Sequence, residues 1–167
     1  MEITIKSSVL FTTVVLTGLS AGFFYAWQVS VIPGTKKVMD LTYLETMQSI
    51  NRAILNPAFF LIFFGTLISL GMASIFEFQT NRLVFGLVLA SAITYLAGTF
   101  GVTAFGNVPL NNELEAMNIS EVATQKITDF RHYYEVKWNR LHMTRTVFSV
   151  LSFLLAMAAV FAQIKSN

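Results

Sequence analysis

Four long stretches without a charged residue constrain this chain more than any other feature. Each is long enough to cross a hydrocarbon core of about 30 Å as a helix, which takes roughly 20 apolar residues. Lipid offers the backbone no hydrogen-bond partner, so a spanning segment is a helix unless it belongs to a closed barrel. Barrel strands alternate in polarity, which these stretches do not. The sequence therefore predicts four transmembrane helices within residues 7–35, 53–76, 83–112 and 146–164.

The composition agrees with a single membrane domain. Hydrophobic residues make up 54% of the 167 residues and charged residues only 12%, and a chain of this length has room for one domain. The absence of cysteine excludes disulfides and thiolate chemistry. The net charge of +2 is too small to suggest a nucleic-acid partner. We expect one domain over residues 1–167, with spans at about 8–32, 57–76, 83–107 and 146–164 and extramembrane segments at about 36–55 and 113–145.

Local signals predict where these elements begin and end. Pro33-Gly34 predicts the end of the first span, because proline has a fixed φ and no N–H. Asn56-Pro57 predicts the N-cap and first residue of the second span. Thr42 and Glu45 have the spacing of a capping box, which predicts an amphipathic helix from about Tyr43 to Leu55. The amphipathic segment before the fourth span is expected to break or to lean against that helix, with Arg131 on its exposed face.

The predicted fold class is all-α, a four-helix transmembrane bundle with amphipathic extramembrane helices on one side. That side carries most of the lysines and arginines, which predicts a cytoplasmic location for it. We expect an integral protein of the lipid bilayer, in a bacterial inner (plasma) membrane. Gly18 and Gly22 form a small-xxx-small pair that lets another helix approach closely. Two interpretations of the pair stay open, close packing within one bundle and a homo-oligomer interface.

Polar side chains gather at the end of the bundle where the extramembrane helices lie. Helical spacing puts Trp138, His142 and Arg145 on one stripe of the segment that enters the fourth span, with Asn139 beside it. A polar cluster above an apolar, aromatic-rich cavity is typical of a small-molecule site. The competing interpretation is that these residues cap helices or reach toward lipid headgroups. The further candidates lie at the ends of the second and third spans: Asn51, Arg52, Asn107 and Asn111.

Several short motifs, in this order, resemble the DUF1772 family, the anthrone oxygenase-like membrane proteins. The resemblance covers nearly the whole chain, and the Asn-Val-Pro-Leu-Asn-Asn element is its most specific part. It implies a four-span bundle. Members with an assigned activity oxidise an anthrone methylene to the anthraquinone ketone with O2, without metal or flavin. The motifs are Gly-Leu-Ser-Ala-Gly-Phe-Phe-Tyr-Ala at 18–26, Pro33-Gly34, Asn-Arg-Ala-Ile-Leu-Asn-Pro at 51–57, Asn-Val-Pro-Leu-Asn-Asn at 107–112, Trp138 and Arg145-Thr146.

This chemistry needs a dry aromatic pocket, a base and a cation or donors on the forming phenolate. The resemblance implies His142 and Arg145 as catalytic residues, with His142 as the base and Arg145 on the phenolate oxygen. Because the family's histidine corresponds to position 142 or 143, the base assignment stays open. Asn107 or Asn111 would donate further hydrogen bonds, and Asn51, Arg52, Trp138 and Asn139 complete the predicted substrate site.

The expected ligand is a lipophilic polycyclic phenol or anthrone, and no cofactor is predicted. His132 and His142 lie ten residues apart and lack the spacing of a metal-binding pair, so no metal site is predicted either. Two other functions remain open. One is a non-catalytic binding or carrier protein for a lipophile such as a quinone. The other is a structural accessory subunit of a membrane complex.

Overall fold

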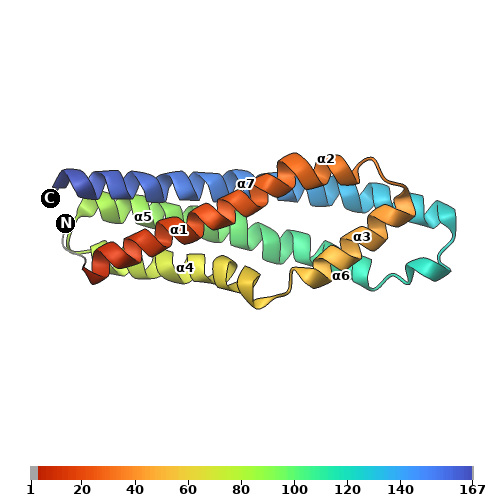
Figure 1. Ribbon diagram of the computed structural model, residues 1–167, viewed down its shortest axis with the longest axis horizontal. Coiled ribbons are helices and arrows are strands. Elements are labelled where there is room, and N and C mark those ends of the chain that lie inside the picture. Colours follow the sequence, from red (N-terminus) through yellow and green to blue (C-terminus); the bar gives the residue numbers. More distant parts are fainter. Residues whose placement is uncertain (1–3, 167) are drawn as a thin grey trace.

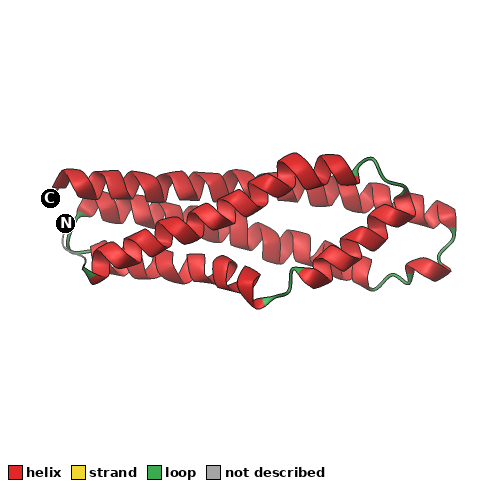
Figure 2. Cartoon of the chain, in the orientation of Figure 1, coloured by secondary structure: helices red, strands yellow, loops and turns green. Residues whose placement is uncertain are grey.

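The computed structural model describes residues 4–166, and these residues form helices joined by short connections (Figures 1 and 2). Four helical stretches are long and apolar enough to cross a membrane, which confirms the predicted all-α bundle. The chain is therefore an integral membrane protein. The four stretches are Ile5–Thr35, Pro57–Glu77, Arg82–Glu115 and Thr124–Lys165.

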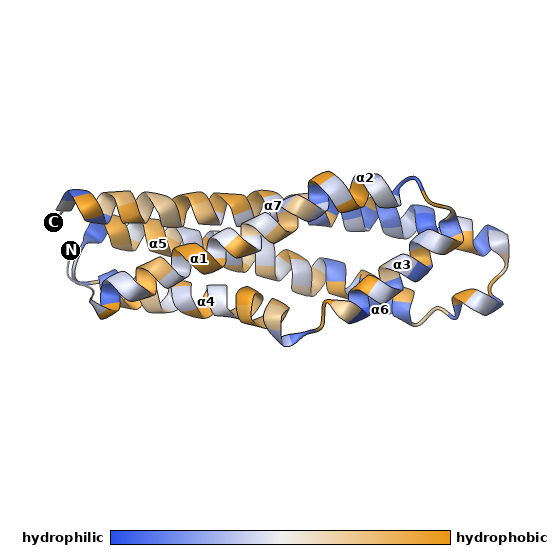
Figure 3. Cartoon of the chain, viewed as in Figure 1, coloured by the Kyte–Doolittle hydropathy of each residue, from blue (hydrophilic) through white to orange (hydrophobic). Residues whose placement is uncertain are grey.

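The two ends of the bundle differ in character. The start of α1 (Ile5–Ala26), the end of α7 (Thr124–Ser166) and the turn between α4 (Pro57–Glu77) and α5 (Arg82–Thr94) lie together at one end (Figure 1). The amphipathic helix α3 (Asp40–Ala53) lies at the other end, where hydrophilic residues become frequent (Figure 3). The extramembrane helices thus gather on one side of the bundle, as predicted.

The helix starts follow local capping chemistry in part. The Asn56 side chain accepts a hydrogen bond from the Phe59 N–H at 3.0 Å, so the predicted start of α4 at Pro57 is confirmed. The predicted start of α3 is wrong. This helix begins at Asp40, with Met39 in extended conformation at its N-cap, and Thr42 lies inside it. The Asp40 carboxylate lies in the first turn, where it interacts favourably with the helix dipole, and this interaction stabilises the earlier start.

The first span does not end at Pro33. A π-helical turn, Trp27–Val31, joins α1 to the short helix α2 (Ile32–Thr35) and carries the helix past the proline. The third span also continues as a helix past its proline, Pro109. Two π-helical stretches, Tyr95–Gly101 and Thr103–Asn107, join α5 to α6 (Val108–Glu115), which contains Pro109. A wider turn before a proline accommodates the carbonyl groups that the missing N–H cannot bond.

Helix α7 runs unbroken over 43 residues, from the extramembrane end through the membrane. Of the two outcomes expected for the segment before the fourth span, the structure shows leaning: from Thr124 onward the helix does not break, and it packs against α3. Arg131 explains the contact between α7 and α3. Its guanidinium is buried, donates to the carbonyl oxygens of Lys36 and Val38, and bonds the carboxylates of Asp40 and Glu135 at 2.8 and 3.2 Å. The predicted exposure of Arg131 is wrong, because its helix face is covered by the chain that leads into α3.

Two apolar cores hold the fold. One fills the extramembrane end, where Tyr43, Leu44 and Met47 of α3 pack on Leu114 and Tyr134. The other lies near the opposite end of the membrane helices and is built around Leu10, Leu70, Val84, Val88 and Ala159. The cavity that contains the candidate site lies between the two cores.

Candidate functional site

A cavity of about 450 Å³ lies between the cores, at the level where α4 begins and α3 ends. Its size is within the range of small-molecule pockets. Nine of its 21 lining residues are aromatic, and a few polar groups converge on it. The lining residues used below are Phe23, Phe24, Trp27, Asn51, Arg52, Phe59, Phe60, Phe63, Phe64, Phe100, Thr103, Asn111, Glu115, Trp138 and Arg145.

The α4 side of the cavity is a series of parallel rings. Phe59 stacks on Phe63 with 5.2 Å between ring centroids and 18° between planes. Phe63 stacks in turn on Phe100, at 5.4 Å and 25°. These rings come from residues one helical turn apart on α4 and from the π-helical stretch that follows α5. A flat apolar wall of this kind suits a planar aromatic ligand, because offset ring stacking is favourable.

Arg145 places a buried positive charge at this wall. Its guanidinium carbon lies 4.7 Å from the ring centre of Phe24 and 5.1 Å from that of Trp138. Its N–H groups donate to His142 and, at 3.4 Å, to the hydroxyl of Thr103. Among residues 4–166 no carboxylate forms an ion pair with it. Aromatic contacts offset only part of the cost of burying a charge, so the site favours an anion.

His142 lies behind Arg145 and is not part of the cavity lining. Its Nε2 lies 3.1 Å from the Phe24 carbonyl oxygen, which can only accept, so Nε2 carries a proton. Its Nδ1 accepts from Nε and Nη2 of Arg145, at 3.0 and 2.8 Å. The imidazole is therefore neutral in this arrangement. Its ring also stacks on Trp138, with 5.1 Å between centroids and 5° between planes. His142 thus fixes the orientation of the guanidinium.

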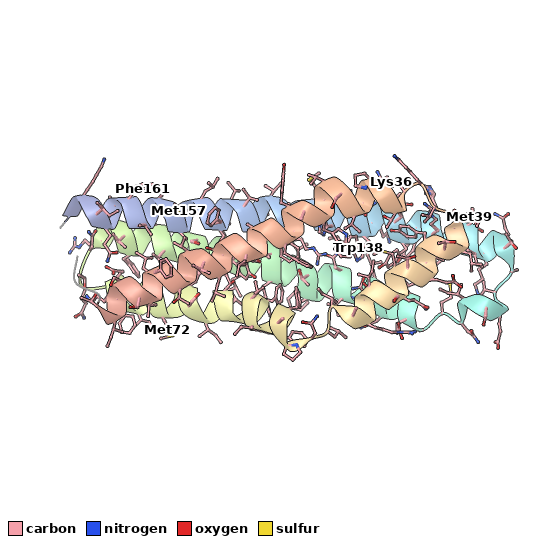
Figure 4. All side chains as sticks on the ribbon, in the orientation of Figure 1. Lys36, Met39, Met72, Trp138, Met157 and Phe161 are labelled. Carbon is pink, nitrogen blue, oxygen red and sulfur yellow. The ribbon has the colours of Figure 1, made fainter. Side chains whose placement is uncertain are left out.

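Asn111 lines the cavity. Its side-chain oxygen accepts from the hydroxyl of Tyr134 at 3.0 Å and from the indole N–H of Trp138 at 2.9 Å. Tyr134 in turn accepts from the amide of Asn51 at 3.3 Å. Trp138 lies toward the middle of the molecule (Figure 4). Because the oxygen of Asn111 is already used by two donors, its amide N–H groups are the part available to a ligand.

The remaining predicted residues lie at different depths. Asn107 is buried behind the wall, where its amide donates to the Trp138 carbonyl at 3.3 Å, and its side-chain oxygen has no partner in the described part of the chain. Arg52 lies at the water-facing rim and forms an ion pair with Glu115 at 2.8 Å. Asn139 does not line the cavity. The structure thus brings Arg145, Asn111, Asn51, Arg52 and Trp138 to the cavity, with His142 and Asn107 immediately behind it.

Over residues 4–166, no three side chains of His, Cys, Asp or Glu gather in a way that could hold a metal ion. The predictions that no metal and no cofactor take part stay predictions.

The anthrone oxygenase family model matches residues 49–155, more than half of the chain. The chain belongs to the anthrone oxygenase family. The matched segment contains all eight residues proposed for the site from the sequence. The wall residues of α1, among them Phe24 and Trp27, precede it. Neither a curated protein nor a solved structure matches the chain.

In this member of the anthrone oxygenase family, the sequence analysis did not assign most of the aromatic wall residues to the site. It also did not identify the residues that hold the site residues in place by hydrogen bonds. Phe59 and Phe63 are one turn apart at the start of α4, a spacing that could have indicated a shared ring face. Thr103 stands four residues before Asn107, and this step also could have extended the polar stripe. No sequence signal indicated that Tyr134 would bridge Asn51 and Asn111, since the three residues come from three different helices.

Proposed function

We propose that this protein is a membrane oxygenase that acts on a lipophilic polycyclic phenol or anthrone. One observation carries the proposal. A buried arginine, which has no carboxylate partner among residues 4–166, faces a cavity lined by aromatic rings. An anthrone anion supplies both complements, a planar apolar body for the rings and an anionic oxygen for the guanidinium. Membership of the anthrone oxygenase family supports the same reaction class.

The proposed reaction begins when the substrate oxygen takes the hydrogen bonds of Arg145. As the guanidinium turns toward the substrate it releases Nδ1 of His142 and no longer separates that nitrogen from the cavity, so His142 can accept the methylene proton, the role that the family resemblance implies for it. Arg145 and the amide of Asn111 stabilise the resulting anion, because preorganised donors in a dry site act strongly on developing charge. The electron-rich anion reacts with O2. One oxygen atom becomes the ketone, and the other leaves as water with the two methylene hydrogens.

Substitution of Arg145 tests the role of its charge. Arg145→Met keeps a long apolar stem and removes the cation, so we expect affinity for 1,8-dihydroxyanthraquinone to fall by roughly 2–3 kcal/mol. The matched control is Arg140→Met, an exposed arginine on the same helix, which should change it by less than about 0.5 kcal/mol. Both tryptophans of the chain line the cavity, so quenching of their fluorescence measures binding. Equal affinities for the two variants would contradict the proposal.

Substitution of His142 separates proton transfer from binding. The amide of His142→Gln can still donate to the Phe24 carbonyl and accept from Arg145, so binding should change by less than about threefold. Because glutamine is no base, O2 uptake with 1,8-dihydroxyanthrone should fall by about 100-fold or more. Undiminished uptake would show that His142 only orients Arg145. Binding without any O2 uptake in the parent protein would instead favour a carrier of lipophiles.

A further inference from the structure

A second hollow, of about 250 Å³, adjoins the cavity on the side of α1 and α4. The two share the side chains of Phe23, Phe24, Ile54, Phe59 and Phe63. The hollow therefore continues the cavity past these side chains. Its remaining lining comes from Ser20, Asn56, Ala58 and Ile62, of which Ala58 is exposed on the outer face of the bundle.

The geometry of α1 and α4 explains the hollow. In Figure 1, α1 crosses the bundle obliquely, near α4 at its own start and near α7 at its end. A Cβ added at Gly65 would lie 3.4 Å from the Leu16 side chain, so the helices are in close contact there. Two turns further along α1, contact depends on long side chains, with 5.8 Å between the ring centres of Phe23 and Phe59. The gap is therefore closed by side-chain rings and not by backbone contact.

The surface around this gap is one that faces lipid. Phe23 is 37% exposed, and Leu19 and Leu61, on the facing helices, are exposed at 51% and 69%. The water-facing rim of the cavity is held differently. There Arg52 pairs with Glu115, and the amide of Gln48 donates to the Leu114 and Met117 carbonyls, so α3 is tied to the end of α6.

We infer that planar lipophilic ligands reach and leave the cavity from the bilayer, between α1 and α4, with Phe23 and Phe59 as the gate. The inference deepens the proposed function, on which it rests for the class of ligand. A polycyclic aromatic partitions into the membrane core, where the apolar gap offers it a path without desolvation of charged groups. On the α5 side of α4, by contrast, Phe63 and Phe64 both pack on Phe100, with 5.4 and 5.9 Å between ring centres.

The test is to fill the hollow from outside without altering the cavity. Ala58→Trp places a ring in the hollow, and Ala58 is not part of the cavity lining. Ala26→Trp is the matched control, an exposed alanine on α1 that lines neither space. The probe is 1,8-dihydroxyanthraquinone in phosphatidylcholine vesicles that contain the full-length protein. Its binding and release are followed by the change in the visible absorbance of the probe itself, because each variant adds a third tryptophan to the two of the parent chain.

A blocked path raises the barrier and leaves its two end states unchanged. We therefore expect Ala58→Trp to slow association and dissociation by the same factor, about tenfold, with an unchanged Kd. Ala26→Trp should leave both rates at the parent value. Equal rates in the two variants, or a change in Kd through dissociation alone, would overturn the inference. Probe binding by a parent protein that shows no O2 uptake with 1,8-dihydroxyanthrone would overturn the oxygenase proposal but not the access path. Failure of the parent protein to bind the probe would overturn both.

Discussion

At the residue scale, the side chain of Asn111 has two roles, one structural and one in ligand binding. Its oxygen holds Tyr134 and Trp138 in place, while its amide nitrogen is available to the cavity. Trp138 in turn stacks on His142, which orients Arg145. The amide is thus linked to the buried cation through one aromatic ring and one imidazole. This arrangement predicts that the structural and the ligand-binding role of Asn111 can be separated by substitution.

Asn111→Asp should retain the fold and lose the anionic ligand. A carboxylate still accepts from the Tyr134 hydroxyl and the Trp138 indole, but it donates nothing and brings a resident counter-charge toward Arg145. We expect affinity for 1,8-dihydroxyanthraquinone to fall by about 2 kcal/mol with little change in melting temperature. Asn111→Ala, in contrast, leaves two buried donors unpaired and should cost about 1–3 kcal/mol of stability. A stable aspartate variant that binds the probe normally would contradict the assigned orientation.

How far the site could be predicted differs between its residues. Arg145, Trp138 and Asn111 could be placed at one level because helical spacing and span ends are readable in a sequence. The position of His142 behind the wall could not, because it depends on the Phe24 carbonyl of a helix more than a hundred residues away in the chain. The same limit applies to Arg131, whose partners come from the connection before α3. A polar residue on an amphipathic helix looks exposed until the segment that covers it is known.

At the scale of elements, the docking of α3 depends on Arg131. This side chain bonds two carbonyl groups and two carboxylates and lies over the Tyr43 ring at 4.6 Å. Arg131→Ala should therefore lower the free energy of unfolding by roughly 2–4 kcal/mol. Thermal unfolding in detergent measures the loss, with the exposed Arg140→Ala as control. If the two variants melt alike, the contact does not hold α3 in place.

The same contact should weaken in acid. The hydrogen bond from Thr128, at 2.6 Å, and the nearby Arg131 hold the pKa of Asp40 below its ordinary value of 3.8. Because the ionised form is the bonded one, its contribution is complete at neutral pH and is lost as the pH falls through the lowered pKa. The difference in melting temperature between the parent and Asp40→Asn should therefore shrink as the pH falls below 3.8. A difference that grows on acidification would contradict this sign.

The contact between the third span and α7 depends on a glycine. A Cβ at Gly98 would lie 1.9 Å from Cγ of Phe148, whereas one at Gly86, on the same span, would meet nothing within 4 Å. Gly98→Ala should push the helices apart and cost roughly 1–3 kcal/mol, while Gly86→Ala should not destabilise the protein. Because Thr99 contacts the Arg145 carbonyl, Gly98→Ala should also weaken probe binding. Equal melting temperatures for the two variants would show that the helices adjust freely.

The elements themselves could be predicted wherever one segment determines its own structure. Uncharged length predicted the four spans, and the Asn56-Pro57 pair predicted the start of α4. The passage of the helix through Pro33 could not be predicted, because it needs the π-helical turn Trp27–Val31 to absorb the missing hydrogen bond. For the pair Gly18 and Gly22, the structure decides in part between packing within one bundle and a homo-oligomer interface. Gly18 faces the Phe153 ring of the same chain and Gly22 faces open space, so the homo-oligomer prediction now depends on Gly22 alone.

At the scale of the whole molecule, the cavity lies where the apolar bundle meets its hydrophilic extramembrane end. This end, called the cap below, is formed by α3, α6 and the start of α7. One core closes the cavity toward the extramembrane end and the other toward the opposite membrane face. A ligand held between them is in contact with lipid-facing rings on one side and with polar groups on the other. An amphiphilic aromatic, with one charged oxygen and a large apolar body, fits this division of the molecule better than a fully polar or a fully apolar compound.

The side of the membrane on which the cap lies stays a prediction from the distribution of lysine and arginine. Because the chain has no cysteine, single substitutions at Lys37, Glu113 and Gln79 can be labelled cleanly with a membrane-impermeant maleimide. Lys37 and Glu113 are exposed at the cap end, and Gln79 is exposed in the turn after α4. In intact cells we expect Gln79→Cys to react and the other two only after permeabilisation. Labelling of all but Gln79 would reverse the orientation, and labelling of Lys37→Cys and Glu113→Cys from opposite faces would contradict the fold itself.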